Sequence, residues 1–289
     1  MPTIYLIRHE DRYKDGFYDC SLTPNGIKNS ITKIDDKILE HEKDFPIYCS
    51  PMLRTIQTIY HHANLHEKQI NLEELIYEHI NNNIAHYSLK EKLPTIETKN
   101  LYLFSDLLKY FENNIIKKEN LLQKLRIFLI FLNAYTNIDD ITLITNLTLD
   151  LIIKLEKEIF NDTEIDEYIL QVSQILNSYD MNKIINKNYN TYKIKIQVEN
   201  YTETIERTKI LLPKLLQDSA IYVTHLTIVN SILINIYKTI YKEYYLEKLS
   251  IEFKNNFNNE IDFCHTNLIK MGCVIRLEIN KENINIFVN

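Results

Sequence analysis

Glycine is unusually scarce in this sequence. Only 3 of the 289 residues are glycine, at positions 16, 26 and 272, whereas average usage would give about twenty. Neither G-x-x-x-x-G-K nor G-x-G-x-x-G can be written with glycines at those positions, so P-loop nucleotide hydrolases and Rossmann dinucleotide enzymes are poor candidates. Tryptophan is absent, while tyrosine occurs 20 times and Ile, Asn and Lys are abundant. We interpret this bias as codon usage in an AT-rich genome.

A surplus of positive charge is also missing. The chain has 33 Lys and Arg residues against 39 Asp and Glu residues, a formal net charge of −6. Proteins that bind nucleic acid usually carry a basic surplus or a basic stripe, so no nucleic-acid partner is expected. The nearest approach to a basic cluster, which we interpret as a solvated face, consists of Lys183, Lys187, Lys193 and Lys195.

Long hydrophobic segments and cysteine motifs are missing too. The longest purely apolar run, Ile127–Leu132, is too short to span a bilayer, and no charged n-region precedes an apolar segment at the N-terminus. The four cysteines, at positions 20, 49, 264 and 273, have neither C-x-x-C nor metal-ligand spacing. We therefore expect a cytoplasmic protein with reduced thiols and no membrane partner.

Both ends of the chain carry a β/α pattern. One helix is expected to start at Thr23, a good N-cap before Pro24, and to run to Ile38; another is expected to open at Pro51. Further helices are predicted over Tyr201–Leu216 and Ile228–Tyr241. The predicted strands are Thr3–Ile7, Pro46–Ser50, Ala220–Thr224, Cys273–Ile279 and Ile284–Val288.

The middle of the chain has a helical pattern instead. One strand-like run, Ile141–Thr145, interrupts it. We predict an α/β fold: a mainly parallel sheet flanked by helices in three α/β/α layers, formed by residues 1–84 and 200–289, with a mostly helical insertion over residues 85–199. The helices expected in the insertion are Leu101–Phe111, Leu121–Leu132, Leu147–Phe160 and Ile165–Leu176.

Polar groups that suit phosphate chemistry follow the predicted strands. Ligands of open α/β sheets bind outside the carboxyl ends of the strands, so groups placed there are expected to converge. Arginine forks match phosphate oxygens, an imidazole can hold a phosphoryl group covalently, and a carboxylic acid can protonate a leaving oxygen. The groups concerned are Arg8, His9, Arg54, Glu78 and His225.

Four segments resemble the histidine phosphatase (phosphoglycerate mutase-like) superfamily. Ile4-Tyr-Leu-Ile-Arg-His9 is similar to its opening strand and R-H-G signature, and Leu22-Thr-Pro-Asn-Gly26 to its L-T-x-x-G helix start. The segment from Ile47 to Thr58 contains S-P-x-x-R-x-x-Q-T, and Ile221-Tyr-Val-Thr-His225 resembles the late strand that ends in a second histidine. In this order and spacing the motifs are specific. They cover about the first 80 residues well and the last 90 more loosely.

The resemblance implies a role for each of these residues. His9 would be the nucleophile that accepts the phosphoryl group, and Arg8, Arg54 and His225 would form the phosphate pocket. Arg12 resembles the arginine of members that begin R-H-G-E-R. Glu78 fits the acid that protonates the leaving group, although Glu73 or Glu74 could align instead. No metal and no cofactor are implied.

The sequence departs from the family pattern at two glycines. Glu10 follows His9 and Leu226 follows His225, where the family has glycine. A carboxylate beside the phosphate could repel it, unless Arg12 neutralises Glu10 or Glu10 points away. A second question comes from Ile144-Thr-Asn-Leu-Thr148, which echoes Val223-Thr-His-Leu-Thr227 with Asn146 in place of His225. We favour His225, because it keeps the imidazole.

A group of histidines lies outside these motifs. His62 and His66 are four residues apart, a spacing that can ligate zinc, and His61 adjoins them. Without a cysteine or a fixed acidic partner, we interpret this group as a surface face.

The sequence supports three functional hypotheses. The first is a metal-independent phosphomonoester hydrolase that acts through a phosphohistidine at His9 on a small phosphorylated substrate or a phosphoprotein. The second is a mutase-like phosphotransferase. The third is a non-catalytic descendant that binds phosphorylated ligands or protein partners, and the two replaced glycines favour it. A homodimer is possible through the apolar stripe Leu121–Leu132, and specificity is expected from the insertion and from residues 15–20.

Overall fold

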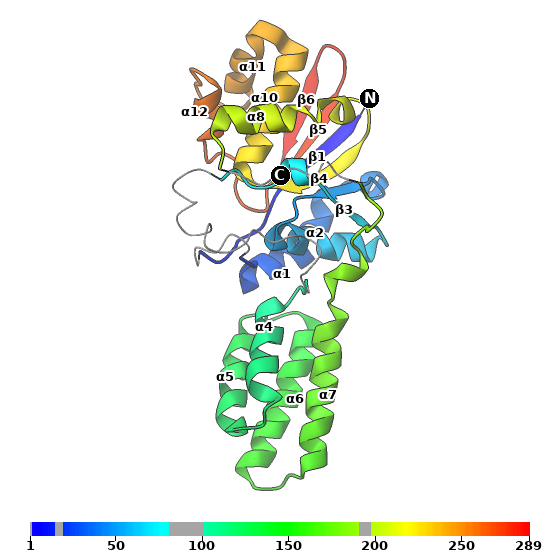
Figure 1. Ribbon diagram of the computed structural model, residues 1–289, viewed down its shortest axis with the longest axis vertical. Helices are drawn as coiled ribbons and strands as arrows, with labels where there is room; N and C mark the ends of the chain where they lie inside the picture. Colours follow the sequence, from blue (N-terminus) through cyan, green and yellow to red (C-terminus); the bar gives the residue numbers. More distant parts are fainter. Residues whose placement is uncertain (1, 15–19, 81–100, 191–197) are drawn as a thin grey trace.

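A six-stranded sheet forms the centre of the protein (Figure 1). The computed structural model describes residues 2–14, 20–80, 101–190 and 198–289. The strand order is β3-β2-β4-β1-β5-β6. Neighbours from β3 to β1 pair in parallel, while β5 and β6 are antiparallel to their neighbours. The strands are β1 (Thr3–Arg8), β2 (Ile47–Cys49), β3 (Ile70–Leu72), β4 (Ala220–Thr224), β5 (Val274–Ile279) and β6 (Ile284–Val288).

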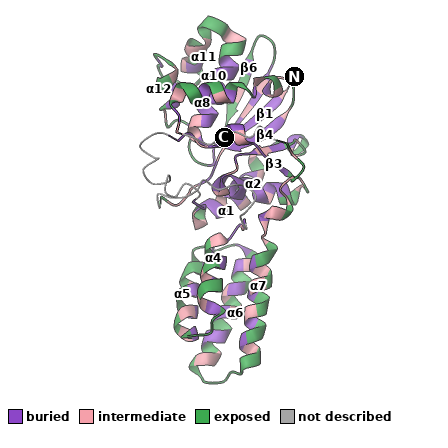
Figure 2. Ribbon diagram, viewed as in Figure 1, coloured by how far each residue is buried: buried purple, intermediate pink, exposed green. Residues whose placement is uncertain are grey.

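Helices cover both faces of the sheet, as alternation along the strands requires. On β1, Tyr5 and Ile7 belong to one hydrophobic cluster, while Ile4 and Leu6 belong to another. The first cluster contains residues of α1 (Pro24–Thr32) and α2 (Leu53–Leu65), and the second contains residues of α8 (Tyr201–Lys209) and α10 (Leu226–Tyr241). The central strands β1 and β4 are accordingly buried between two helical layers, while the edge strand β6 is largely exposed (Figure 2). This confirms the predicted α/β/α sheet fold.

Short helices complete the second layer and the connections. Beside α10 lie α9 (Leu212–Leu215), α11 (Tyr245–Glu252) and α12 (Glu260–Cys264). The short 3-10 helices are η1 (Asp35–Lys37), η2 (Glu40–Glu42), η3 (Glu74–Ile76), η6 (Met181–Lys183) and η7 (Lys242–Tyr244).

A bundle of helices projects from the α1/α2 side of the sheet (Figure 1). Asn161 and Glu164 form a capping box that starts its last helix. Gln57 of α2 ties the bundle to the sheet layer, because its Nε2 donates to the carbonyl of Leu103 at 2.9 Å. The bundle consists of α4 (Ser105–Tyr110), which continues into a π-helical turn η5 (Phe111–Ile115), and of α5 (Leu121–Asn133), α6 (Asp139–Glu156) and α7 (Asp162–Ser178).

The structure corrects three local predictions. Ile141–Thr145 is not a strand but part of α6, so the segment that contains Asn146 is no copy of the β4–α10 unit, and Asn146 is exposed on a helix. The helix that starts at Pro24 ends at Thr32 rather than at Ile38, and η1 follows it. Strand β3 was not predicted, because three residues are too few for a periodic signal.

Some predictions concern residues outside the described ranges. These are Lys193 and Lys195 of the lysine cluster and residues 15–19 of the expected specificity loop. Within the described ranges, no helix has the length and apolar character needed to cross a bilayer.

Candidate active site

The carboxyl ends of β1, β2 and β4 bring the predicted residues together. Strands β1 and β4 are paired in parallel so that Arg8 lies opposite Thr224, and the backbone N–H of His9 donates to the carbonyl of Thr224 at 3.0 Å. The next residue of the chain after Thr224 is His225, and the rings of His9 and His225 meet edge to face with centroids 5.3 Å apart. The structure therefore places His225 beside His9, as the sequence predicted, and not Asn146.

His9 is held with one ring nitrogen fixed and the other left for chemistry. Its Nδ1 lies 2.7 Å from the carbonyl oxygen of Glu10. A carbonyl can only accept, so Nδ1 carries the proton and a neutral ring has its lone pair on Nε2. The ring is 3% exposed, and burial, with a further contribution from the charge of Arg54, holds its pKa well below the usual value for histidine. At neutral pH, His9 is an uncharged imidazole.

Arg54 lies beneath the two imidazoles and is completely buried. It is the second residue of α2, and its side chain has no solvent exposure. Its Nη2 pairs with Oε2 of Glu78 and lies 3.4 Å from Nδ1 of His225. Because a guanidinium only donates, Nδ1 of His225 accepts, and the positive charge depresses the pKa values of both histidines.

Ser50 completes the surroundings of His225. Its Oγ lies 2.9 Å from Nε2 of His225. Since Nδ1 of this ring accepts, the neutral tautomer carries its proton on Nε2 and donates it to the serine hydroxyl. Burial is the largest cause of the low pKa of His225. The resting site therefore holds two neutral imidazoles beside a charged arginine.

Two further arginines, Arg8 and Arg12, act on the site through their charge. Arg8 donates through Nη1 to the carbonyl of Ile269 at 2.5 Å. Its buried Nε has no hydrogen-bond partner among the described residues. Nη1 of Arg12 lies 3.1 Å from the sulfur of Cys20. The charges of both arginines act on the pKa of His9, so they form one positive field with Arg54.

Among the three acids considered from sequence, Glu78 lies in the site. It pairs with Arg54, and its Oε1 is 3.9 Å from Nδ1 of His225. Glu73 points elsewhere, because its carboxylate accepts the N–H of Leu75 at the start of η3 and the hydroxyl of Tyr189. Glu74 lies in the first turn of η3.

Glu10 points away from the two histidines. Its carboxylate is buried and accepts from Nδ2 of Asn29 on α1, and burial raises its pKa. It lies against Gly272, where an added Cβ would come within 1.9 Å of Oε1. Gly272 has φ +68° and donates its N–H to the carbonyls of Arg8 and His9. The carboxylate of Glu10 thus lies beside Asn29 and Gly272 rather than beside the two imidazoles.

The remaining motif residues hold the site loops in place. Thr58 accepts the backbone N–H of Glu10 at 3.0 Å, and Oε1 of Gln57 accepts the N–H of Leu22 at 2.8 Å. Thr23 caps α1 by accepting the N–H of Gly26 at 3.1 Å. Gly26 is required there, because a Cβ would lie 2.1 Å from the carbonyl oxygen of Asp11. These contacts fix the chain on both sides of His9.

Sequence reasoning gave no role to Ser50 or Arg207. Ser50 begins the S-P-x-x-R-x-x-Q-T segment, and only the structure shows its hydrogen bond to His225. Arg207 of α8 donates to the carbonyl of Leu75 at 2.5 Å and lies 3.7 Å above the ring of Tyr77. It thereby positions the segment that carries Glu78. Nothing local in the sequence distinguishes Arg207 from any other arginine on a helix.

The amino ends of two helices point to the same edge of the sheet. α10 starts at Leu226 directly after His225, and α2 starts at Leu53 directly before Arg54. Helix amino ends carry partial positive charge and favour anions.

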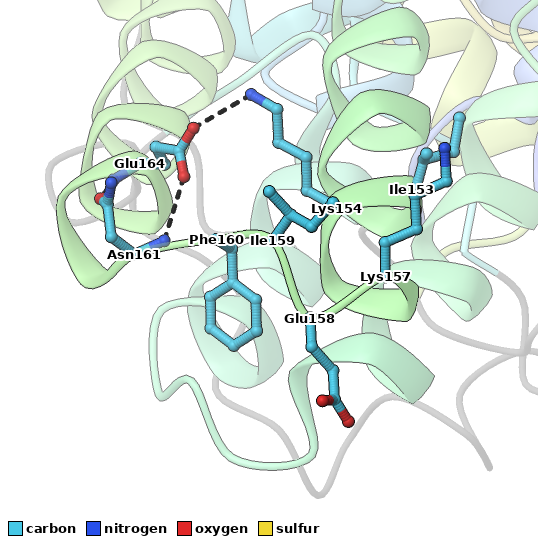
Figure 3. Close-up of a pocket in the computed structure, with 8 residues that line it drawn as sticks. All are labelled: Ile153, Lys154, Lys157, Glu158, Ile159, Phe160, Asn161 and Glu164. Atoms are coloured by element: carbon cyan, nitrogen blue, oxygen red, sulfur yellow. Dashed lines mark hydrogen bonds and ion pairs between the residues drawn. The ribbon is translucent and has the colours of Figure 1, made fainter.

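A hollow lies away from these residues, at the turn between α6 and α7, where Lys154 pairs with Glu164 at 3.2 Å (Figure 3). It holds no histidine or cysteine and is far from the strand ends along the bundle.

The contact between Glu10 and Gly272 makes a stability prediction. Gly272→Ala forces a side chain into left-handed backbone and onto the Glu10 carboxylate, so it should lower the free energy of unfolding by at least about 1–2 kcal/mol. Urea denaturation measures this loss. The double variant Glu10→Ala/Gly272→Ala should recover the steric part and keep the backbone part. Unchanged stability of Gly272→Ala would contradict the described packing of Glu10.

Comparison with known proteins gives a limited result. No protein-family model matches the chain, and no curated protein matches it. Among solved structures, the chain is similar to the ecdysone phosphate phosphatase EPPase from Bombix mori, crystallised in complex with tungstate. The identity is 10% and the TM-score is 0.47, over 99% of this chain and 92% of that chain. Similarity at this level assigns no activity to this chain.

Proposed function

We propose that the protein is a phosphomonoester hydrolase that transfers the phosphoryl group to Nε2 of His9 and then to water. The observation that carries the proposal is the state of His9. Its Nδ1 is engaged by the carbonyl of Glu10, its ring is neutral because burial lowers its pKa, and the charges of Arg54, Arg8 and Arg12 lower that pKa further. A neutral imidazole in a positive field is suited to attack phosphorus, because the field offsets the negative charge of the substrate.

The charges of the site favour a phosphomonoester dianion. Arg8, Arg12 and Arg54 carry three positive charges. With both imidazoles neutral, the site keeps a positive surplus whether Glu78 is protonated or ionised, and this surplus attracts a fully ionised phosphate ester. Glu10 does not disturb this balance, because its carboxyl group is turned toward Asn29 and Gly272.

In the first step, Nε2 of His9 forms a bond to phosphorus as the bond from phosphorus to the ester oxygen breaks. Glu78, in its protonated form, gives its proton to the departing oxygen. The carbonyl of Glu10 stabilises the positive charge that develops on the ring, because it accepts the Nδ1 proton. Arg54 supplies guanidinium N–H groups for the equatorial oxygens, and His225 holds Arg54 through its acceptor Nδ1.

In the second step, water attacks phosphorus and the bond from phosphorus to Nε2 of His9 breaks. The carboxylate of Glu78, left ionised by the first step, takes the proton of this water. Inorganic phosphate leaves, and the neutral imidazole and the protonated acid are restored. Neither step needs a group beyond those that the chain supplies.

Removal of the nucleophile tests the proposal. With p-nitrophenyl phosphate and a chelator present, His9→Ala should lower kcat/KM by at least about 10³-fold, because the variant lacks the nitrogen that is proposed to attack phosphorus. The exposed residue His41 supplies a matched control: His41→Ala should keep the wild-type rate. Equal, near-zero rates of wild type and His9→Ala would contradict hydrolysis and favour a binding protein. Transfer of the phosphoryl group to added alcohols in preference to water would favour a mutase-like enzyme.

The role of Glu78 can be separated from its structural pairing with Arg54. Glu78→Gln should lower the hydrolysis rate of an alkyl phosphate such as glycerol 2-phosphate by about 10²–10⁴-fold. p-Nitrophenolate leaves without protonation, so the loss of kcat/KM, which reports phosphoryl transfer to His9 and not the later attack of water, should be much smaller with p-nitrophenyl phosphate. Glu73→Gln is the matched control and should affect the two substrates equally. An equal loss on both substrates in Glu78→Gln would contradict an acid role.

The depressed pKa of His9 predicts the acidic limb of the pH profile. The attacking form is the neutral ring, and protonation removes it as pH falls. The pKa of His9 in the folded protein lies well below 6.5. Protonation of His9 should therefore not lower kcat/KM near pH 6.5, and the decline should occur only at lower pH. Arg54→Gln removes the second-largest cause of the shift, so it should move this limb toward higher pH. A wild-type limb centred at or above pH 6.5 would contradict a neutral, buried nucleophile.

A further inference from the structure

Two histidines and an aspartate meet at the end of α2 that is remote from the histidine pair of the active site. His62 lies in the last turn of α2 and His66 directly follows it, while Asp35 begins η1. The sequence led us to interpret these histidines as a surface face because no fixed acidic partner was apparent. The structure corrects this interpretation: His62 is fully buried, and Asp35 is the acidic partner of both rings.

The three side chains converge on one point. Nδ1 of His62 and Nε2 of His66 each lie 2.7 Å from the same carboxylate oxygen, Oδ1 of Asp35. The two ring centroids are 4.8 Å apart, and the three potential ligand atoms all lie within 4.8 Å of one another. His66 and Asp35 are partly exposed, so solvent reaches the cluster on one side.

We propose that Asp35, His62 and His66 form a binding site for a divalent transition-metal ion, with Zn²⁺ the best match. Two imidazole nitrogens and one carboxylate oxygen are a ligand set of zinc sites, with water in the fourth position. Magnesium and calcium prefer oxygen ligands, which two imidazoles do not supply. Ligand atoms around tetrahedral zinc lie about 3.4 Å apart, so Oδ1 of Asp35 must move about 0.7 Å away from each of the two ring nitrogens when the ion binds.

The surroundings of Asp35 hold its carboxylate in the orientation that the site needs. Nζ of Lys43 lies 2.8 Å from the other oxygen, Oδ2, and also 2.8 Å from Oε2 of Glu40. Lys43 thus fixes the carboxylate and leaves Oδ1 to the two rings. Its positive charge weakens the attraction for a cation, while Glu40 offsets part of that charge.

The position of the cluster indicates a structural ion rather than a catalytic one. Arg54 and His62 are eight residues apart on α2, which is about 12 Å along the helix. The ion would join η1, which follows α1, to the end of α2. Metal binding should therefore raise the free energy of unfolding without changing phosphate chemistry at His9. Failure of this proposal would not contradict the proposed hydrolase activity, and failure of the hydrolase proposal would not contradict this one.

Zinc titration of the full chain tests the site. The protein should carry no polyhistidine tag and should first be treated with a chelator and gel-filtered. Calorimetry should then show one Zn²⁺ bound per chain, and free Zn²⁺ at about 100 times Kd should raise Tm by about 5 °C. Co²⁺ in its place should give visible absorption of tetrahedral intensity. Asp35→Asn and His66→Ala should each weaken binding at least about 10-fold and leave p-nitrophenyl phosphate hydrolysis unchanged.

Two controls separate a metal site from a hydrogen-bonded cluster. His41→Ala removes an exposed histidine outside the cluster and should keep the wild-type Kd. Lys43→Met removes the competing cation and should bind Zn²⁺ as tightly as wild type or more tightly, although its metal-free Tm falls. The proposal is wrong if wild type shows no saturable uptake at equimolar Zn²⁺. It is equally wrong if Asp35→Asn and His66→Ala, both shown to be folded by circular dichroism, bind Zn²⁺ as wild type does.

Discussion

The buried guanidinium of Arg54 is the feature on which the candidate site depends. Removing a charge from water costs several kcal/mol, and only strong partners offset that cost. Here the partners are the carboxylate of Glu78 and the acceptor nitrogen of His225. Burial is the largest cause of the low pKa values of His9 and His225, and the same charge adds to it, so one buried cation orders the acid and helps to keep both rings neutral.

The scarcity of glycine has a physical meaning at this site. Position 10, where related motifs carry glycine, holds a glutamate whose side chain leaves the site and lies against Gly272. Gly272 has left-handed backbone and no room for a Cβ, and its N–H binds the carbonyls of Arg8 and His9. Gly272 thus leaves room for the side chain of Glu10, although the two residues are far apart in the sequence. Because Glu10 is turned away, its carboxylate does not face the imidazole of His9.

The sequence was informative where local chemistry determines structure. Thr23-Pro24 predicted the start of α1, and strand ends followed by polar groups predicted the convergence of Arg8, His9 and His225. Long-range contacts could not be predicted from the sequence. Examples are the hydrogen bond between Ser50 and His225, the anchoring of the Glu78 segment by Arg207, and the approach of Asp35 to His62. Each of these depends on the packing of segments that are distant in the sequence.

The one strand prediction that failed has a local cause. Ile141–Thr145 is a short β-branched run, and five residues do not distinguish a strand from a helix by periodicity. The acidic pair Asp139 and Asp140 in the first turn of α6 favours the helix through its dipole and was the signal that the prediction overlooked. Burial then decides the outcome, because Ile141, Ile144 and Thr148 share one buried face. The assignment of residues 85–199 as a separate insertion remains a prediction.

We propose that Nε2 of His9 carries the phosphoryl group during turnover. Rapid mixing of the protein with p-nitrophenyl phosphate, a quench in alkali that preserves phosphohistidine, and mass spectrometry of the peptides can detect this intermediate. We expect a burst of p-nitrophenol that does not exceed one equivalent per chain, with one phosphoryl group on the peptide that contains His9. Hydrolysis that proceeds with no label on His9, or with the label on His225 or Ser50, would contradict it.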